Sequence, residues 1–207
     1  MLTDLPYRTI AIVRGKDRDA ALRTVLTLAE EGITAAEVSF TTPDAPWVID
    51  RARRELGPDA LLGAGTVLTA TAAARAADAG ANFLVTPGLG TDLRRAAPFA
   101  LPLLAGALTP GEVMDAVEHG ATAVKLFPAS FGGPDYLAAL RAPFPDVPFV
   151  PVGGVDAGAA RAYLAAGAVA VGVGSPLIGD AADTGDLGPL RARIAAWRTA
   201  LAEEAAA

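Results

Sequence analysis

Two charged side chains stand inside apolar segments, where a hydrophobic residue would pack better. Lys125 is in the middle of "TAVKLFPA" (122–129), and Glu37 lies in the apolar part of "EEGITAAEVSF" (30–40). The chain has only two lysines, the other being Lys16, so lysine is a rare choice in this sequence. Burial disfavours the charged ammonium and lowers the pKa of a lysine. The free amine can attack a ketone and form a Schiff base, which makes Lys125 a candidate nucleophile.

The spacing of the sequence predicts that Glu37 and Lys125 face each other. Each lies five residues after a glycine, Gly32 and Gly120, that ends an Ala-rich amphipathic stretch. Glycine adopts the left-handed conformation after a helix at little cost, so these glycines mark helix ends. Equal offsets predict equal heights on the strands that follow. If these are the second and sixth strands of an eight-stranded ring, the two side chains point toward one another across its interior.

A glutamate beside a lysine has two interpretations. The functional interpretation is that the carboxylate transfers protons during dehydration of the carbinolamine and at the carbon next to the imine. The structural interpretation is a buried ion pair that only fixes the core, although such pairs often stabilise a fold no better than hydrophobic residues do. The glutamate charge raises the pKa of the lysine whereas burial lowers it, and the sequence does not decide which effect is larger.

The elements that must position these residues alternate between strands and helices. Four times, an Ala-rich helical stretch ends at a glycine and is followed by a β-branched apolar run. Strands that are apolar on both faces and alternate with helices indicate a parallel sheet covered by helices. Eight such units predict an α/β fold, a single-domain (β/α)8 TIM barrel over residues 1–207, with an open doubly wound sheet as the alternative. The predicted strands and the last helix lie near 9–15, 34–40, 60–67, 82–88, 101–108, 122–129, 147–154, 168–175 and 187–204.

Glycines follow the seventh and eighth predicted strands, where barrel enzymes commonly hold phosphate. The segments "PVGGVDAG" (151–158) and "VGVGSPL" (171–177) contain Gly153, Gly154, Gly174 and Ser175. Backbone without side chains allows close approach, and N–H groups near a helix start point at an anion. Tight turns also need glycine, so the pattern favours a phosphate site without requiring one.

Composition and charge exclude several classes of protein. The chain has 52% hydrophobic residues, a mean hydropathy of +0.38 and a net charge of −6. It can bury a large core, and its acidic balance argues against a sequence-independent nucleic-acid binder. The absence of cysteine and the single histidine, His119, argue against thiolate and imidazole-rich metal sites. We see neither a signal peptide nor a membrane span, so we expect a cytoplasmic protein.

Six motifs at the predicted strand ends resemble those of the class I aldolases that cleave 2-keto-3-deoxy-6-phosphogluconate or its galactonate epimer. Some members of that family act on 4-hydroxy-2-oxoglutarate. The resemblance covers most of the chain, and its motifs occur in the family's order. They are "AEVSFTTP" (36–43), "GAGTVL" (63–68), "FLVTPG" (83–88), "VKLFPAS" (124–130), "PVGGV" (151–155) and "GVGS" (172–175).

The resemblance implies a role for each candidate site residue. Lys125 would be the Schiff-base lysine and Glu37 the acid/base. Arg14 would face the substrate carboxylate, and Thr66 would bond the pyruvyl carboxylate or the carbinolamine. The apolar wall and the phosphate site would comprise Pro87, Phe127, Gly153, Gly154, Gly174 and Ser175. The resemblance also implies a homotrimer that binds pyruvate and a phosphorylated keto acid. No metal or other cofactor is expected, because the iminium would supply the electrophilic stabilisation.

One departure from the family concerns substrate choice. Gluconate-type members often carry an arginine four residues after the glutamate, where this chain has Thr41. A threonine lacks the bidentate carboxylate grip of a guanidinium. The segments "AIVRG" and "TTP" lean toward the galactonate type. The alternatives are cleavage of unphosphorylated 4-hydroxy-2-oxoglutarate, a phosphate-binding barrel of other chemistry, such as a thiamin-phosphate synthase-like or isomerase-like enzyme, and a non-catalytic phosphosugar binder.

Overall fold

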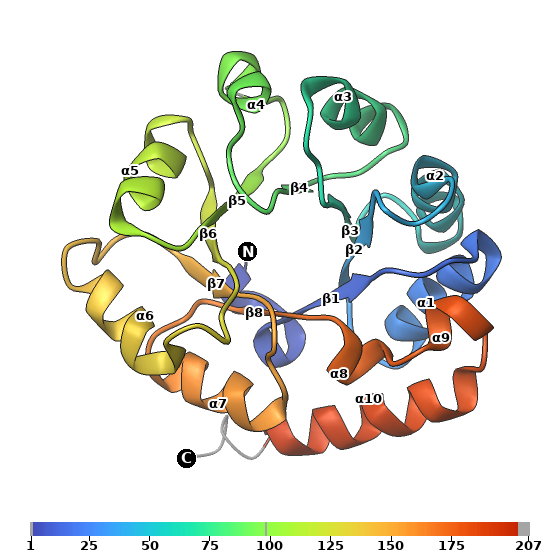
Figure 1. Ribbon diagram of the computed structural model, residues 1–207. Helices are drawn as coiled ribbons and strands as arrows, with labels where there is room; N and C mark the ends of the chain where they lie inside the picture. The colour runs from blue at the N-terminus through green and yellow to red at the C-terminus, as the bar shows by residue number, and fades with distance from the viewer. Residues whose placement is uncertain (1, 98, 203–207) are drawn as a thin grey trace.

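Eight parallel strands form a ring in the computed structural model, which describes residues 2–97 and 99–202 (Figure 1). Their order is β7-β6-β5-β4-β3-β2-β1-β8. A parallel bridge between Val152 and Gly172, and a bond from the Val169 N–H to the Phe149 carbonyl, close the ring between β7 and β8. The predicted barrel is therefore confirmed, and the open sheet was the wrong alternative. The strands are β1 (Thr9–Val13), β2 (Ala35–Ser39), β3 (Leu61–Gly65), β4 (Leu84–Val85), β5 (Leu103–Ala107), β6 (Ala123–Leu126), β7 (Phe149–Pro151) and β8 (Val171–Val173).

Helices surround the ring on its outside (Figure 1). The last helix follows the prediction as far as Ala202, and the rest of its predicted range lies outside the described residues. Two short helices, α8 and α9, were not predicted. None of the helices between residues 2 and 202 combines the length and the hydropathy that a membrane span requires. The helices are η1 (Leu2–Asp4), η2 (Pro6–Arg8), α1 (Arg18–Glu30), α2 (Ala45–Leu56), α3 (Ala70–Asp78), α4 (Thr91–Ala96), α5 (Pro110–Glu118), α6 (Gly133–Arg141), α7 (Ala157–Ala165), α8 (Ser175–Ile178), α9 (Ala181–Thr184) and α10 (Leu187–Ala202).

The helix ends follow the signals in the sequence. The four glycines predicted to stop helices all have positive φ, at 87° for Gly32, 88° for Gly80, 77° for Gly120 and 93° for Gly167. These values lie in the left-handed region, which glycine enters without a steric cost. Several helices begin with a side chain that accepts a hydrogen bond from a backbone N–H three residues later. These capping residues are Asp17, Thr69, Thr109 and Asp156.

Three strands, β4, β7 and β8, are much shorter than the apolar runs that predicted them. At one end of β4 the Asn82 side chain, rather than a backbone carbonyl of the strand, pairs with β3, because its Oδ1 accepts the Leu62 N–H at 3.1 Å. At the other end Pro87 has no N–H to donate. The same limitation shortens β7, in which Pro148 precedes the strand and Pro151 ends it. Apolar periodicity alone therefore overestimates the length of these strands.

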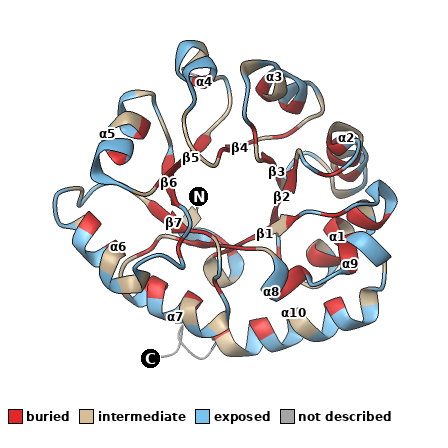
Figure 2. Ribbon diagram, viewed as in Figure 1, coloured by how far each residue is buried: buried red, intermediate tan, exposed pale blue. Residues whose placement is uncertain are grey.

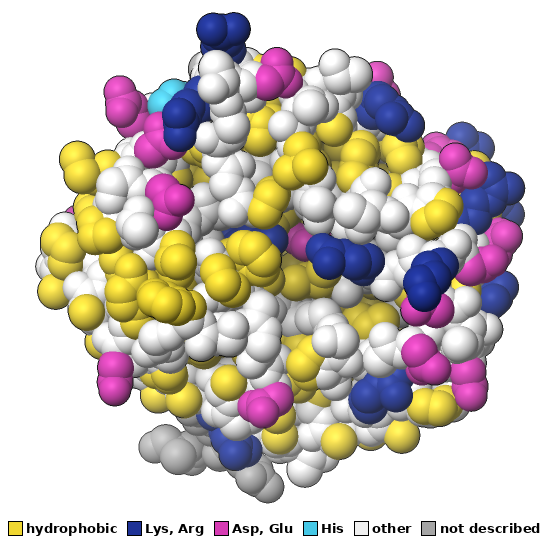
Figure 3. Space-filling view, viewed as in Figure 1, with side chains coloured by type: hydrophobic (Ala, Val, Ile, Leu, Met, Phe, Trp, Pro, Cys, Tyr) yellow, Lys and Arg dark blue, Asp and Glu magenta, His cyan; other side chains and the backbone are white. Residues whose placement is uncertain are grey.

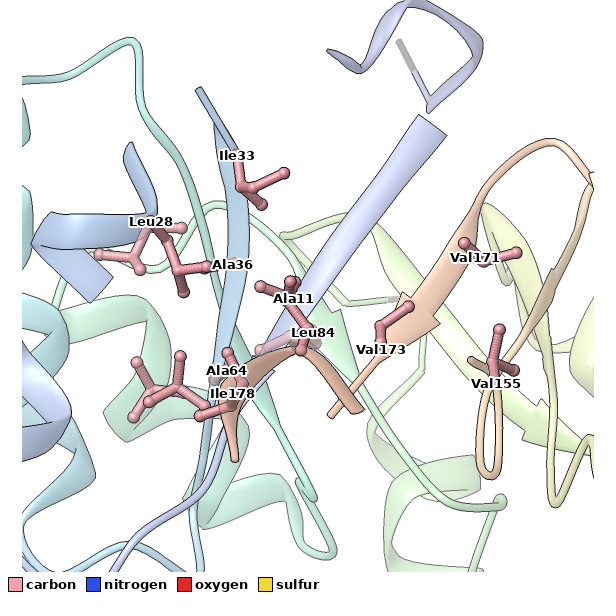
Figure 4. Packing of buried hydrophobic residues seen from close by; sticks show 14 of the residues in the cluster. Ala11, Leu28, Ile33, Ala36, Ala64, Leu84, Val155, Val171, Val173 and Ile178 are labelled. Atoms are coloured by element: carbon pink, nitrogen blue, oxygen red, sulfur yellow. The ribbon is translucent and has the colours of Figure 1, made fainter. Parts of the chain in front are cut away.

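The buried side chains form an inner and an outer layer, with the strands between them. Figure 2 shows the strands of the ring coloured mostly as buried, and the helices with both buried and exposed residues. The outer layer packs strands against helices, as where Ala36 of β2 lies beside Leu28 of α1 in Figure 4. Ala35, one residue earlier, belongs to the inner layer. Successive side chains of a strand point to opposite sides, so this alternation decides which residues reach the interior of the ring.

Candidate active site

Glu37 and Lys125 both point into the interior of the ring. Glu37 is two residues after the inward Ala35, and Lys125 is two residues after Ala123, another inner-layer residue. Their outward neighbours, such as Val124, pack in the outer layer. Two-residue periodicity thus turns both charged side chains toward the interior of the ring.

A cavity of about 480 Å³ opens where these two side chains lie. Figure 3 shows a hollow near the centre of this face, where basic and acidic side chains meet among hydrophobic ones. Its volume is within the range of small-molecule sites. The structure brings every candidate from the sequence to its wall, namely Arg14, Glu37, Thr66, Pro87, Lys125, Phe127, Gly153, Gly154, Gly174 and Ser175.

Burial changes the proton affinity of both charged groups. Lys125 is 5% exposed, and loss of solvation lowers the pKa of its amine; the Arg14 charge adds to this, whereas Glu37 opposes it. Glu37 is 3% exposed, and burial raises the pKa of its carboxyl, against the effects of Lys125 and Arg14. Burial is therefore the larger effect for both groups. A lowered lysine pKa favours the nucleophilic amine, and a raised glutamate pKa favours a carboxyl that can carry a proton.

The pair does not resemble a structural salt bridge. In the described part of the chain no direct ion pair joins Glu37 to Lys125, although each charge shifts the pKa of the other. The Lys125 Nζ atom instead lies 4.9 Å from the centre of the Phe127 ring. Buried ion pairs that stabilise a core require close contact and good geometry. This arrangement is better suited to accepting a substrate between the two groups.

Two glycines leave the space that the site needs. A Cβ atom at Gly65 would lie 2.4 Å from Oε1 of Glu37, so only glycine at this position of β3 leaves room for the Glu37 carboxyl group. A Cβ at Gly106, the register partner of Lys125, would lie 2.1 Å from the backbone carbon of Pro87. Gly106 therefore allows the segment at Pro87 to fold across β5 and reach the cavity wall.

Arg14 and Thr66 lie together at one side of the cavity. The Arg14 Nη2 group donates to Thr66 Oγ1 at 3.4 Å. Thr66 has a φ of 56°, which is rare for a β-branched residue. Such a conformation costs about 1–3 kcal/mol and persists only where the surroundings enforce it. The chain thus holds this hydroxyl next to a guanidinium despite the backbone strain.

Bare backbone lies on another side of the cavity, between β7 and α8. Gly153 and Gly154 have φ values of 98° and 73°. A Cβ atom at Gly154 would lie 2.9 Å from the Ser130 side chain, so that position is restricted to glycine by conformation and by space. Gly174 immediately precedes α8, and Ser175 is its first residue. These backbone groups are accessible to a ligand in the cavity.

Some wall residues were missed in the sequence. Ile12 and Val152 line the cavity, and both follow from strand alternation, since Ile12 is the register partner of Glu37. Ile178 and Gly179 also line it, but they come from α8 and its end, which gave no strand or motif signal. Ser39, which lies behind the wall and contacts Arg14 and Thr66, was missed as well, although it follows Glu37 by two residues on the same face of β2.

The sequence and the fold are similar to those of known aldolases. Residues 5–190 match the profile of the family described as KDPG and KHG aldolase. A probable 2-dehydro-3-deoxy-6-phosphogalactonate aldolase of Rhizobium meliloti is 37% identical over 180 residues, which cover 86% of this chain and 85% of that protein. A 2-dehydro-3-deoxy-phosphogluconate aldolase of Pseudomonas aeruginosa is 44% identical over 140 residues, which cover 67% of this chain and 63% of that protein.

A solved structure provides the corresponding comparison of folds. The KDPG aldolase of Legionella pneumophila, with pyruvate captured at low pH as a covalent carbinolamine intermediate, is 30% identical with a TM-score of 0.84. The match covers 97% of this chain and 95% of that one. The similarity thus extends over the whole barrel that carries the cavity.

Proposed function

Because this chain belongs to the KDPG and KHG aldolase family, we propose that it is a class I aldolase that cleaves a 2-keto-3-deoxy-6-phospho sugar acid. The products are pyruvate and glyceraldehyde 3-phosphate. The observation that carries the proposal is the buried Lys125, with its lowered pKa, opposite Glu37 in a cavity of about 480 Å³. A deprotonated amine and a carboxyl group of raised pKa are the two groups that Schiff-base chemistry needs.

The reaction begins with attack of the Lys125 amine on the C2 ketone of the substrate. The amine nitrogen loses a proton and the carbonyl oxygen gains one, and the resulting neutral carbinolamine then loses water to form an iminium ion. Glu37 supplies the proton to the departing hydroxyl group, directly or through water, which fits a carboxyl group whose pKa is raised by burial.

Carbon–carbon cleavage then uses the iminium as an electron sink. The C4 hydroxyl group loses its proton, the C3–C4 bond breaks, and its electron pair moves to the iminium to give an enamine. The C4–C6 fragment leaves as glyceraldehyde 3-phosphate. The enamine is protonated at C3, and water hydrolyses the new iminium to release pyruvate and free Lys125. Glu37 mediates these proton transfers as well.

The other wall residues bind the substrate without taking part in bond breaking. Arg14 and Thr66 hold the carboxylate next to the ketone, because a guanidinium and a hydroxyl group are donors for carboxylate oxygens. Pro87 and Phe127 keep the amine in apolar surroundings. At the far side of the cavity, backbone N–H groups donate hydrogen bonds to the phosphate. They belong to Gly153, Gly154, Gly174 and Ser175.

Pyruvate release from a set of substrates tests the proposal. We expect cleavage of both the 6-phosphogalactonate and the 6-phosphogluconate epimer, measured by coupling pyruvate to lactate dehydrogenase. Thr41 in place of arginine favours the galactonate epimer. Unphosphorylated 4-hydroxy-2-oxoglutarate, the second candidate substrate, should be slower because it leaves the glycine-lined side of the cavity empty. Failure of both phosphorylated compounds to yield pyruvate would contradict the proposal.

The proposal also covers assembly and location. We propose that residues 1–207 work as one barrel domain, in a cytoplasmic homotrimer that uses small-molecule substrates and binds no nucleic acid. The family resemblance supports the trimer, and the net charge of −6 argues against nucleic-acid binding. Light scattering of the purified protein should give the mass of three chains, and a mass of one chain would contradict the trimer.

A further inference from the structure

Ser39 is a hydroxyl-bearing residue that lies behind the cavity wall and contacts two residues that line it, Arg14 and Thr66. It is the last residue of β2 and is fully buried, with 0% exposure. Because it follows Glu37 by two residues, it lies on the same inward face of the strand. Neither the family motifs nor the predicted strand pattern assigned it a role.

The Ser39 hydroxyl group contacts three neighbouring side chains. Its Oγ atom lies 2.9 Å from Thr66 Oγ1 and 2.8 Å from Thr41 Oγ1. It also accepts two longer bonds, each of 3.4 Å, from Arg14 Nε and from the backbone N–H of Thr41. Arg14 in turn donates from Nη2 to Thr66 Oγ1 at 3.4 Å. The four residues therefore form one connected network, of which Arg14 and Thr66 line the cavity.

Hydrogen-bond chemistry restricts the directions in this network. A guanidinium only donates, so both Ser39 and Thr66 accept from Arg14. A hydroxyl group has one proton and two acceptor lone pairs. The two short bonds of Ser39 can run in either direction, and in one of the two Thr41 donates to Ser39 and Ser39 donates to Thr66. Both lone pairs of Thr66 are then occupied, and its own proton is free to point toward the cavity.

This direction suits a carboxylate, which can only accept hydrogen bonds. We propose that Ser39 is a positioning residue, which holds Arg14 and Thr66 so that their free donors meet the carboxylate of the keto acid. The inference rests on the proposed function, because it assigns the recognition of the pyruvyl carboxylate. It also explains how the site works with Thr41 in place of arginine: Thr41 supports Ser39 and leaves charge recognition to Arg14.

The test measures how readily Lys125 is trapped by cyanoborohydride with pyruvate and with methyl pyruvate, whose ester has no negative charge. In Ser39→Ala, the pyruvate concentration for half-maximal trapping should rise about tenfold or more, since bonds to charged groups are lost or misdirected. The maximal trapping rate and the trapping of methyl pyruvate should stay near wild type. Thr24→Ala removes a fully buried hydroxyl group from α1 and should leave the trapping of both pyruvate and methyl pyruvate unchanged.

The outcomes separate this inference from the proposed function. Absence of any pyruvate adduct in the wild-type protein would overturn the proposed function. A normal adduct in the wild-type protein, with the same half-maximal concentration in Ser39→Ala, would overturn only the role of Ser39. Equal losses for pyruvate and methyl pyruvate would also overturn it, because they would indicate a general disturbance. Ser39→Cys nearly keeps the side-chain volume but has only a weak thiol donor. If the alanine variant does not fold, Ser39→Cys should show the same result, namely a higher pyruvate concentration for half-maximal trapping and unchanged trapping of methyl pyruvate.

Discussion

Replacing Lys125 by methionine should reduce aldol cleavage by about 10⁴-fold or more, as for loss of other covalent nucleophiles. Methionine has a similar length and no amine, so no iminium can form and the C3–C4 bond loses its electron sink. Cleavage is measured as pyruvate release, and covalent chemistry as the mass added after reduction with pyruvate present. Both signals should disappear in Lys125→Met.

The matched control is Lys16→Met, because Lys16 is the other lysine of the chain and is exposed. This variant should keep both signals. The fold should survive Lys125→Met, since burial already disfavours the ammonium and methionine removes that cost. We expect its thermal midpoint to remain within about 4 °C of wild type. Loss of the folded state would instead support the interpretation of Lys125 and Glu37 as a structural pair, and normal turnover would contradict the mechanism.

The second large effect is expected for Glu37→Gln, which keeps the shape of the side chain and removes its acid/base function. Turnover should fall by about 10²- to 10⁴-fold, the usual contribution of a positioned acid/base group. The most specific signal is exchange of the pyruvate methyl protons in deuterated water, followed by NMR. That exchange requires removal of a proton from C3, so it should be nearly lost in Glu37→Gln.

Trapping of pyruvate distinguishes a chemical role from a structural one. Glu37→Gln retains Lys125, so it should still give the reduced adduct, although more slowly. Glu55→Gln, on the exposed side of α2, serves as the control and should exchange the methyl protons at the wild-type rate. Wild-type exchange in Glu37→Gln would assign the proton transfers to another group, such as a water molecule.

Much of the architecture could be predicted because local signals agreed with the fold. The helix-ending glycines determined where strands begin, and the two-residue period determined which side chains point inward. Equal offsets from Gly32 and Gly120 therefore sufficed to place Glu37 and Lys125 in one cavity. The same reasoning, continued by two residues, would have found Ser39.

Other features depend on tertiary structure and could not be predicted. Whether burial or the Glu37 charge has the larger effect on the Lys125 pKa depends on how completely the ring excludes water from the amine. That exclusion is a property of the assembled core. The positive φ of Thr66 and the space left by Gly65 depend on neighbouring strands. The strands β4 and β7 are short because of particular hydrogen bonds and prolines, which an apolar pattern does not record.

The central claim is that Lys125 presents an uncharged amine to a keto acid, and reductive trapping across pH tests it most directly. The wild-type protein is incubated with pyruvate and cyanoborohydride at a series of pH values, and the labelled peptides are identified by mass spectrometry. We predict an adduct on Lys125 and none on Lys16, with the yield rising as pH increases through a midpoint below the ordinary lysine value of 10.5. An unlabelled Lys125, or a yield that rises only near that ordinary value, would contradict the claim.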